Sequence, residues 1–416
     1  MDFGRGVTIE NACAWPILDS RGNWTIACEI KLRDGSVGQA QVPAGASTGR
    51  HEAIALPAKQ AAANINAEIN EAIAGSPADL PAIDGRLIAV DGTPNKSRLG
   101  ANALLGVSCA LARAISVSRR QPLWATLRDI FQPSRPAVVP MPMINIISGG
   151  LHAGANIEFQ DFLIIPVHAR SVYEALESAV DIHRAVRNEL TARGFQLTGV
   201  ADEGGWGPLL RSNEEAIEIL STCIQRSGRE LQIAIDVASS HFYEHGSYRL
   251  GREGRTLSSQ GMIDLIADWA DRYPLSSVED ALAEDDWDGW VSLHSQLGHK
   301  LQLIGDDFFT TNPDRLERGI AIGAANAILV KMNQIGTLTE TFAVIERAHA
   351  AGFRCVISAR SGETEDSFLA DLATASGAGQ IKIGSITRSE RLSKYNRMIE
   401  LETALNTFAK NLQCKL

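Results

Sequence analysis

Four short apolar runs each end on a charged residue: IAID at 233–236, SSVE at 276–279, LIGD at 303–306 and AILVK at 327–331. Helix-like segments separate them, and this alternation indicates buried parallel strands of an α/β barrel or sheet. Parallel strands place their C-terminal residues at one common mouth. We therefore expect four side chains to converge there: Asp236, Glu279, Asp306 and Lys331.

The types of these strand-end residues predict chemistry at the mouth. Three carboxylates offer the hard oxygen ligands that a divalent cation prefers, and a lysine beside them could act as a base. Structural ion pairing at the strand ends is the alternative interpretation. Because the C-terminal mouth is where barrel enzymes carry out their reactions, the pattern favours a metal-dependent lyase.

Four further apolar runs raise the total to the eight that a closed barrel requires: INII at 144–147, FLIIP at 162–166, CVIS at 355–358 and IKIG at 381–384. The first two are separated by too few residues for a crossover helix, so we expect them to pair directly.

The segment ahead of the barrel predicts a smaller α+β domain. It contains a hairpin signal at Asp34-Gly35 and helical patterns over 58–73 and 100–119. The proline-rich stretch QPSRPAVVP at 132–140 is typical of a linker. We therefore divide the chain into an N-terminal capping domain, 1–135, and a barrel domain, 136–416.

Composition excludes several classes of function. The 416 residues carry a formal net charge of -10 with both signs interspersed, which argues against nucleic acid or a membrane as partner. The six cysteines form no CxxC pair, so neither a zinc site nor a disulfide framework is indicated. The N-terminus lacks a signal-peptide pattern, and the apolar segment at 101–117 is interrupted by Arg113, so we expect a core helix and a cytoplasmic protein.

Seven longer motifs resemble the enolase family: ILDSRGN at 17–23, PAGASTGRHEA at 43–53, DEGGWGP at 202–208, SVEDALAEDDWDGW at 277–290, GDDFFTTNP at 305–313, ILVKMNQIGTLTET at 328–341 and SARSGETED at 358–366. The resemblance covers nearly the whole chain. It implies an α+β cap on a modified (β/α)8 TIM barrel with two antiparallel strands at its start. The implied reaction is reversible dehydration of 2-phosphoglycerate to phosphoenolpyruvate with two Mg²⁺ ions.

The resemblance also implies roles for single residues. Lys331 would remove the proton alpha to the carboxylate, and Glu203 would protonate the departing hydroxyl; a lysine base beside Mg²⁺ is an established pairing in the enolase superfamily. The substrate contacts would be His152, Gln160, Asp161, Arg360, Ser361 and Lys382. The metal ligands would be Asp236, Glu279 and Asp306, with Ser47 of a glycine-rich lid holding the second ion. For each, a structural or surface role is the plainer alternative.

Several positions depart from the family pattern. Ala359 stands where the family has a histidine, Asp161 replaces a glutamate, and Ala44 replaces a serine. The first two changes would leave a larger, less basic space around the third carbon of the substrate. Ala27 and Glu400 replace an acid and an arginine that pair across the usual dimer, so we expect a homodimer or higher homo-oligomer with altered contacts.

Three functions follow from these matches and departures. The first is a divergent phosphopyruvate hydratase. The second is a specialised paralogue acting on a phosphorylated or phosphonylated acid, such as a carboxyphosphonoenolpyruvate synthase of phosphonate antibiotic biosynthesis. The third, a scaffolding protein on an inactive enzyme fold, is disfavoured because Glu203 and Lys331 are both present.

Overall fold

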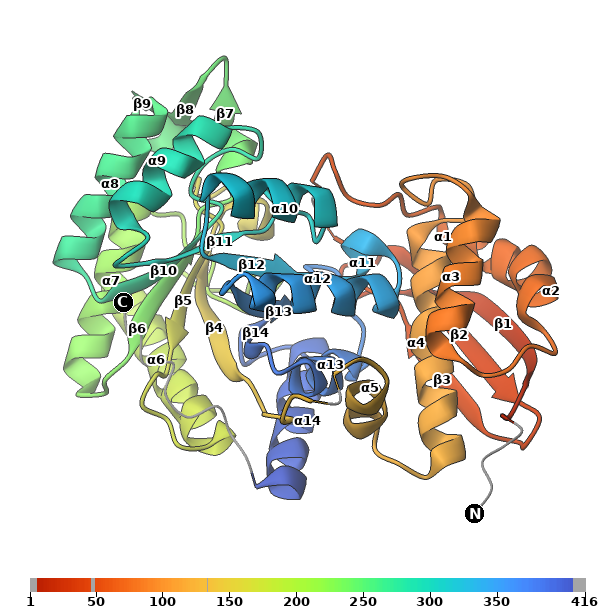
Figure 1. The fold of residues 1–416 in the computed structure, drawn as a ribbon. Coiled ribbons are helices and arrows are strands. Elements are labelled where there is room, and N and C mark those ends of the chain that lie inside the picture. Colours follow the sequence, from red (N-terminus) through yellow and green to blue (C-terminus); the bar gives the residue numbers. More distant parts are fainter. Residues whose placement is uncertain (1–5, 46–48, 133, 407–416) are drawn as a thin grey trace.

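The main body of the protein is a closed eight-stranded barrel (Figure 1). The computed structural model describes residues 6–45, 49–132 and 134–406, so Ser47 lies outside the described residues. The strands close in the order β10 (Leu275–Glu279), β11 (Gln302–Gly305), β12 (Ala327–Val330), β13 (Arg354–Ser358), β14 (Gly379–Gly384), β4 (Met141–Ser148), β5 (Asp161–Ile165) and β6 (Gln232–Asp236). Each coincides with one of the eight apolar runs, which confirms the predicted barrel.

One strand, β5, runs against its neighbours. It pairs antiparallel with both β4 and β6, whereas the other neighbouring strands are parallel. The link from β4 to β5 holds only the 3₁₀ turn η2 (Gly150–Ala153), which is too short for a crossover helix. As a result, Asp161 begins β5 at the mouth where β6 ends, directly beside Asp236 in the ladder.

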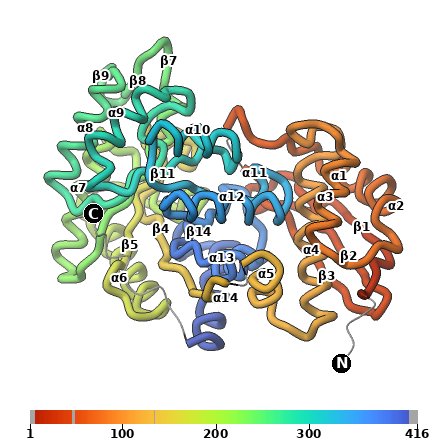
Figure 2. The backbone as a smooth tube through the Cα atoms, in the orientation of Figure 1, coloured from red at the N-terminus to blue at the C-terminus, as the bar shows by residue number. Residues whose placement is uncertain are grey.

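Helices cover the outside of the barrel, and the tube in Figure 2 shows them surrounding the strands. They are α6 (Val172–Ala192), α7 (Asn213–Ser227), α8 (Ser259–Arg272), α9 (Trp287–Leu297), α10 (Pro313–Ile322), α11 (Met332–Ile335), α12 (Leu338–Ala350), α13 (Phe368–Ser376) and α14 (Ser389–Leu405). A small sheet of β7 (Tyr243–Glu244), β8 (Ser247–Leu250) and β9 (Arg255–Leu257) precedes α8. The 3₁₀ turn η3 (Ser239–Phe242) leads into this sheet, and η4 (Gly251–Glu253) connects β8 to β9. Strands covered in this way are apolar on both faces, as the sequence runs predicted.

The N-terminal part is an antiparallel sheet with helices on one side. Its strands are β1 (Ile9–Leu18), β2 (Trp24–Leu32) and β3 (Val37–Gln41), and Gly35 supplies the left-handed residue (φ 87°) of the predicted hairpin between β2 and β3. Its helices are α1 (Ala58–Asn64), the π-helical segment η1 (Ile65–Ile69), α2 (Asn70–Ile73), α3 (Leu80–Asp91), α4 (Ala101–Arg119) and α5 (Leu123–Phe131). The proposed division at residue 135 falls between α5 and β4.

Helix α4 joins the two parts of the protein. It contacts β2 and β3 on one side and α11 and α12 on the other. Among the described residues it is the one helix long and apolar enough to cross a membrane, with a mean hydropathy of 1.4, but 78% of that stretch is buried inside the protein. Packing between the sheet and the barrel therefore accounts for its apolar sequence.

Gly38 on β3 is required by the close approach of α4. A Cβ atom at this position would lie 2.2 Å from Ala110 O and 2.2 Å from Ala114 N, both backbone atoms that cannot rotate away. We expect Gly38→Ala to destabilise the protein by about 3 kcal/mol, as overpacking does elsewhere. Urea unfolding would measure this. The control is Gly85→Ala on α3, where no heavy atom lies within 4 Å of the added carbon; equal stability of both variants would contradict the packing argument.

Candidate active site

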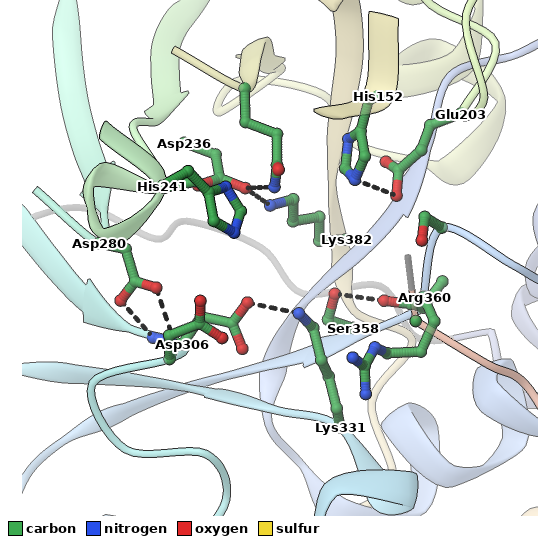
Figure 3. Close-up of a pocket in the computed structure, with 16 residues that line it drawn as sticks. His152, Glu203, Asp236, His241, Asp280, Asp306, Lys331, Ser358, Arg360 and Lys382 are labelled. Carbon is green, nitrogen blue, oxygen red and sulfur yellow. Dashed lines mark hydrogen bonds and ion pairs between the residues drawn. The ribbon is translucent and has the colours of Figure 1, made fainter. Parts of the chain in front are cut away.

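A polar pocket opens at the mouth formed by the carboxyl ends of the parallel strands (Figure 3). The described residues that line it are Gly45, His152, Gln160, Glu203, Asp236, Ala238, His241, Asp280, Asp306, Asp307, Lys331, Ser358, Ala359, Arg360, Ser361 and Lys382. Nine of the twelve predicted site residues are among them. Asp161 and Glu279 lie just behind this lining.

Lys382 on β14 bridges two of the predicted metal ligands. Its Nζ lies 2.8 Å from Asp236 Oδ2 and 2.7 Å from Glu279 Oε2. Gln160 Nε2 donates to the same Asp236 oxygen at 3.0 Å. Burial lowers the pKa of Lys382, but the two carboxylates outweigh burial and hold that pKa well above its ordinary value. Lys382 thus carries a full positive charge between the ends of β6 and β10.

Lys331, directly after β12, makes a second ion pair at the mouth. Its ammonium contacts Asp306 Oδ2, and the other Asp306 oxygen accepts a hydrogen bond from Gln334 Nε2 at 3.0 Å. Burial lowers the pKa of Lys331, but the Asp306 carboxylate opposes burial and the net result is a raised pKa. The Asp306 carboxylate thus favours the protonated form of Lys331.

A cluster of three acids, Asp280, Asp306 and Asp307, was only partly foreseen from the sequence. Their carboxylate oxygens lie within 4.8 Å of one another. Asp280 has a left-handed backbone conformation (φ 42°), and its carboxylate accepts hydrogen bonds from the backbone N–H groups of Asp306 and Asp307, each at 2.8 Å. Burial, then the neighbouring carboxylates, raise the pKa of Asp280 well above its ordinary value and that of Asp307 to about 7. The adjacent acids Glu279-Asp280 and Asp306-Asp307 in the sequence could have indicated this cluster.

These acids fit a hard divalent cation. The buried Glu279 Oε1 has no hydrogen-bond partner within the part of the chain that the structure describes. Such an orphaned oxygen is costly in a protein interior unless a cation or proton satisfies it. Every donor offered by the three acidic strand ends and by Asp280 and Asp307 is an oxygen, which is the ligand set that Mg²⁺ prefers.

The opposite wall of the pocket carries an imidazole between two acids. His152 Nδ1 lies 3.1 Å from Asp161 Oδ2, and His152 Nε2 lies 4.0 Å from Glu203 Oε1. Burial lowers the pKa of His152, but Asp161 and Glu203 reverse the effect and raise that pKa. Burial raises the pKa of Glu203, yet the cationic neighbours His152 and Arg391 lower it overall. These opposite shifts favour a protonated imidazole beside an ionised Glu203.

Arg360, after β13, is held by an acid from the N-terminal segment. Its Nη1 and Nη2 donate to the two oxygens of Glu52 at 3.0 and 3.1 Å, and Nη1 also donates to Asn333 Oδ1 at 3.0 Å. A short two-bond bridge between Ala44 and Gly362 fixes the same loop against that segment. Sequence reasoning missed Glu52, although it lies within the motif at 43–53.

The departures from the family pattern also lie here. Ala359 lines the pocket and is 5% exposed, so no imidazole extends from that position. Asp161 contacts His152 and Asn145 instead of the open pocket. His241, on η3, faces the pocket near Asp236 in Figure 3 and was not foreseen, because nothing in the local sequence distinguishes it from a loop histidine.

The fold and this pocket define an α/β-barrel enzyme whose charged groups gather at the carboxyl ends of the strands. Two family models match the chain: "Enolase, N-terminal domain" over residues 9–127 and "Enolase, C-terminal TIM barrel domain" over residues 136–413. The chain belongs to the enolase family and is a lyase-type enzyme. Members of this family generally bind Mg²⁺, and the acidic cluster described above could hold such an ion.

Proposed function

We propose that this enzyme catalyses the reversible dehydration of 2-phosphoglycerate to phosphoenolpyruvate. The observation that carries the proposal is the placement of Lys331 and Glu203 on opposite walls of one pocket, with acids and cations between them (Figure 3). An elimination needs one group to take the alpha proton and another to assist departure of the hydroxyl. Glycerate-type substrates offer both reacting atoms on adjacent carbons.

Lys331 is the proposed base. In its neutral form, Nζ accepts the alpha proton, and the electron pair of the broken C–H bond moves into the substrate carboxylate. Bound to Asp236, Glu279 and Asp306, Mg²⁺ would stabilise the added negative charge and offset the Asp306 charge that raises the pKa of Lys331. Lys382 would contact the substrate carboxylate.

Glu203 and His152 form the proposed acid. The third-carbon C–O bond breaks as the double bond forms, and the hydroxyl leaves as water after accepting a proton. The raised pKa of His152 favours a proton on its imidazole, which lies 4.0 Å from Glu203, so we infer that the pair delivers this proton through the Glu203 carboxylate. Asp161 positions His152 from behind, and Arg360 with Ser361 would hold the phosphate through charge-assisted hydrogen bonds.

The test is phosphoenolpyruvate formation from 2-phosphoglycerate at saturating Mg²⁺, followed by its absorbance and run beside Lys331→Ala. We expect turnover in the parent and none in the variant. Chelation of the metal should abolish turnover, and added Mg²⁺ should restore it. A parent that binds Mg²⁺ but forms no product would overturn 2-phosphoglycerate as the substrate.

A second candidate is favoured by Ala359 and Asp161. Together they remove an imidazole and retract a carboxylate near the third carbon, which would suit a substrate other than 2-phosphoglycerate. A specialised paralogue such as a carboxyphosphonoenolpyruvate synthase would use the same base and metal ligands on a phosphonylated acid. The choice between the two candidates depends on the effect of restoring the imidazole.

We expect Ala359→His to raise kcat/KM for 2-phosphoglycerate about tenfold, because the added imidazole supplies a hydrogen bond and a proton near the leaving hydroxyl. The steady-state rate of phosphoenolpyruvate formation measures it. The control is Ala44→Ser, another return to the family residue, on a backbone bridge to Gly362; we expect no change there. No gain in Ala359→His would favour the phosphonylated substrate.

We propose a cytoplasmic homodimer or higher homo-oligomer that binds neither nucleic acid nor membrane. Glu400 pairs with Arg397 of its own helix at 2.8 Å, and Ala27 is buried, so neither supplies the usual charge to a partner subunit. Sedimentation velocity would determine the oligomer size.

A further inference from the structure

Arg391 on α14 is a buried arginine whose hydrogen bonds go to the backbone of the site. Its exposed fraction is 0%. Nη1 donates to Arg360 O at 2.7 Å and to Ile383 O at 3.0 Å, and Nη2 donates to Ser361 O at 2.6 Å. The guanidinium therefore connects the loop after β13, which holds the proposed phosphate contacts, to β14.

The same guanidinium faces the proposed acid. Arg391 Nη1 lies 4.0 Å from Glu203 Oε1, and Arg391 Nε lies 3.5 Å from Glu390 Oε1. The backbone of Glu203 is fixed nearby, because Ser385 N donates to its carbonyl at 2.8 Å. Packing here is close: a Cβ added at Gly384 would lie 2.9 Å from Glu203 O and 3.0 Å from Arg391 Cδ.

Burial of a charged group is unfavourable unless its hydrogen bonds and countercharges are supplied. A residue that only fills space at this position could be apolar, whereas Arg391 Nη1 and Nη2 donate to the carbonyls of Arg360 and Ser361. Its Nε makes no hydrogen bond to the described residues and lies 3.5 Å from Glu390 Oε1. Arg391 contacts the backbone of Arg360 and Ser361 and also faces the Glu203 carboxylate. One planar, permanently charged group thus touches both the loop of the proposed phosphate contacts and the proposed acid.

We propose that Arg391 is a positioning residue that sets the geometry of the phosphate-binding loop and holds the Glu203 carboxylate toward the leaving hydroxyl. Only the part of this role that involves Glu203 rests on the proposed function. The phosphate-binding part requires just that an anion binds at Arg360 and Ser361.

Two other cations on α14 provide comparisons. Lys394, also buried, donates to Thr364 O and pairs with Glu363 at 3.0 Å, so it supports the same loop through different partners from those of Arg391. Arg397 pairs with Asp371 at 2.8 Å, away from the pocket lining. Arg397→Gln is therefore the matched structural control, because it removes an ion pair from the same helix.

The experiment compares Arg391→Gln, Arg391→Lys and Arg397→Gln in the full chain with Mg²⁺. Calorimetry gives the affinity for inorganic phosphate. Nuclear magnetic resonance in D₂O gives alpha-proton exchange of 2-phosphoglycerate, and absorbance gives phosphoenolpyruvate formation. We expect Arg391→Gln to weaken phosphate binding about tenfold and to lower the ratio of dehydration to exchange about tenfold, as loss of an orienting contact typically does.

Arg391→Lys separates the two parts of the role. A lysine restores the charge near Glu203, so the ratio of dehydration to exchange should return toward that of the parent. Its single nitrogen cannot bridge the carbonyls of Arg360 and Ser361, so phosphate affinity should stay reduced. Arg397→Gln should lower the melting temperature without changing either quantity.

The proposal is overturned if Arg391→Gln behaves like Arg397→Gln, with lower stability but unchanged phosphate affinity and ratio. If Arg391→Gln does not fold, unchanged phosphate affinity in Arg391→Lys overturns it instead. A parent that binds phosphate but does not exchange the alpha proton of 2-phosphoglycerate would refute the proposed substrate, while the phosphate measurements would still decide the role of Arg391.

Discussion

Replacing Lys331 with alanine is expected to reduce alpha-proton exchange of 2-phosphoglycerate about a thousandfold, which is within the range for loss of a positioned general base. Lys331 is the proposed general base, and its ammonium contacts Asp306 in the pocket. Deuterium uptake at the alpha carbon, followed by nuclear magnetic resonance, measures the first proton transfer apart from loss of the hydroxyl.

The metal site should survive this substitution. Asp236, Glu279 and Asp306 all remain, and removal of a neighbouring cation does not weaken their attraction for Mg²⁺. Calorimetric titration should therefore give an affinity within about threefold of the parent value, since only a neighbouring charge changes. The matched control is Lys300→Ala, a lysine paired with Asp271 on the surface. Exchange that persists in Lys331→Ala would refute the assignment of the base.

Glu203→Gln should separate the two halves of the reaction. We expect phosphoenolpyruvate formation to fall about a thousandfold, because the amide cannot relay a proton to the leaving hydroxyl. Alpha-proton exchange should continue at a rate much closer to that of the parent, since Lys331 acts on the other reacting carbon. Running both assays on one enzyme preparation provides the comparison.

The control for Glu203→Gln is Asp202→Asn. Asp202 is the adjacent acid, but it pairs with Arg21 at 2.8 Å and does not line the pocket. We expect near-parental rates for it in both assays. Equal loss of exchange and dehydration in Glu203→Gln would show that Glu203 is needed for the first proton transfer. Full retention of dehydration would instead assign proton delivery to His152 alone.

The barrel could be predicted because each of its strands leaves a recognisable pattern in a short stretch of sequence. Each strand is a short apolar run, and strand burial on both faces leaves that pattern in the sequence whatever lies around it. The reversal of β5 followed from the length of one connection, which cannot contain a crossover helix. Strand-end positions such as Asp236 and Lys331 were predictable for the same reason, since a barrel places such ends together.

The partners of the site residues were less predictable. Glu52 and Arg360 are separated by 308 positions, and no local pattern indicates that the acid meets the arginine. Lys382 was expected to contact substrate, yet it bridges two carboxylates here. The pKa of Glu203 is lowered by His152 and Arg391, which approach it from η2 and α14. The ionisation of a side chain depends on its neighbours in space, whereas a sequence motif gives only which residues are present and in what order.

The reversed strand β5 limits how this barrel tolerates changes in loop length. The other barrel strands are joined through helices, where extra residues can be absorbed outside the sheet. The β4–β5 connection is different, because it carries His152 and also determines where Asp161 enters the ladder opposite Asp236. One inserted residue that slipped the register of β5 would turn Asp161 to the other face of the sheet. Peptide tags or grafted segments are therefore better placed in the β7–β8 turn, which lies outside the barrel.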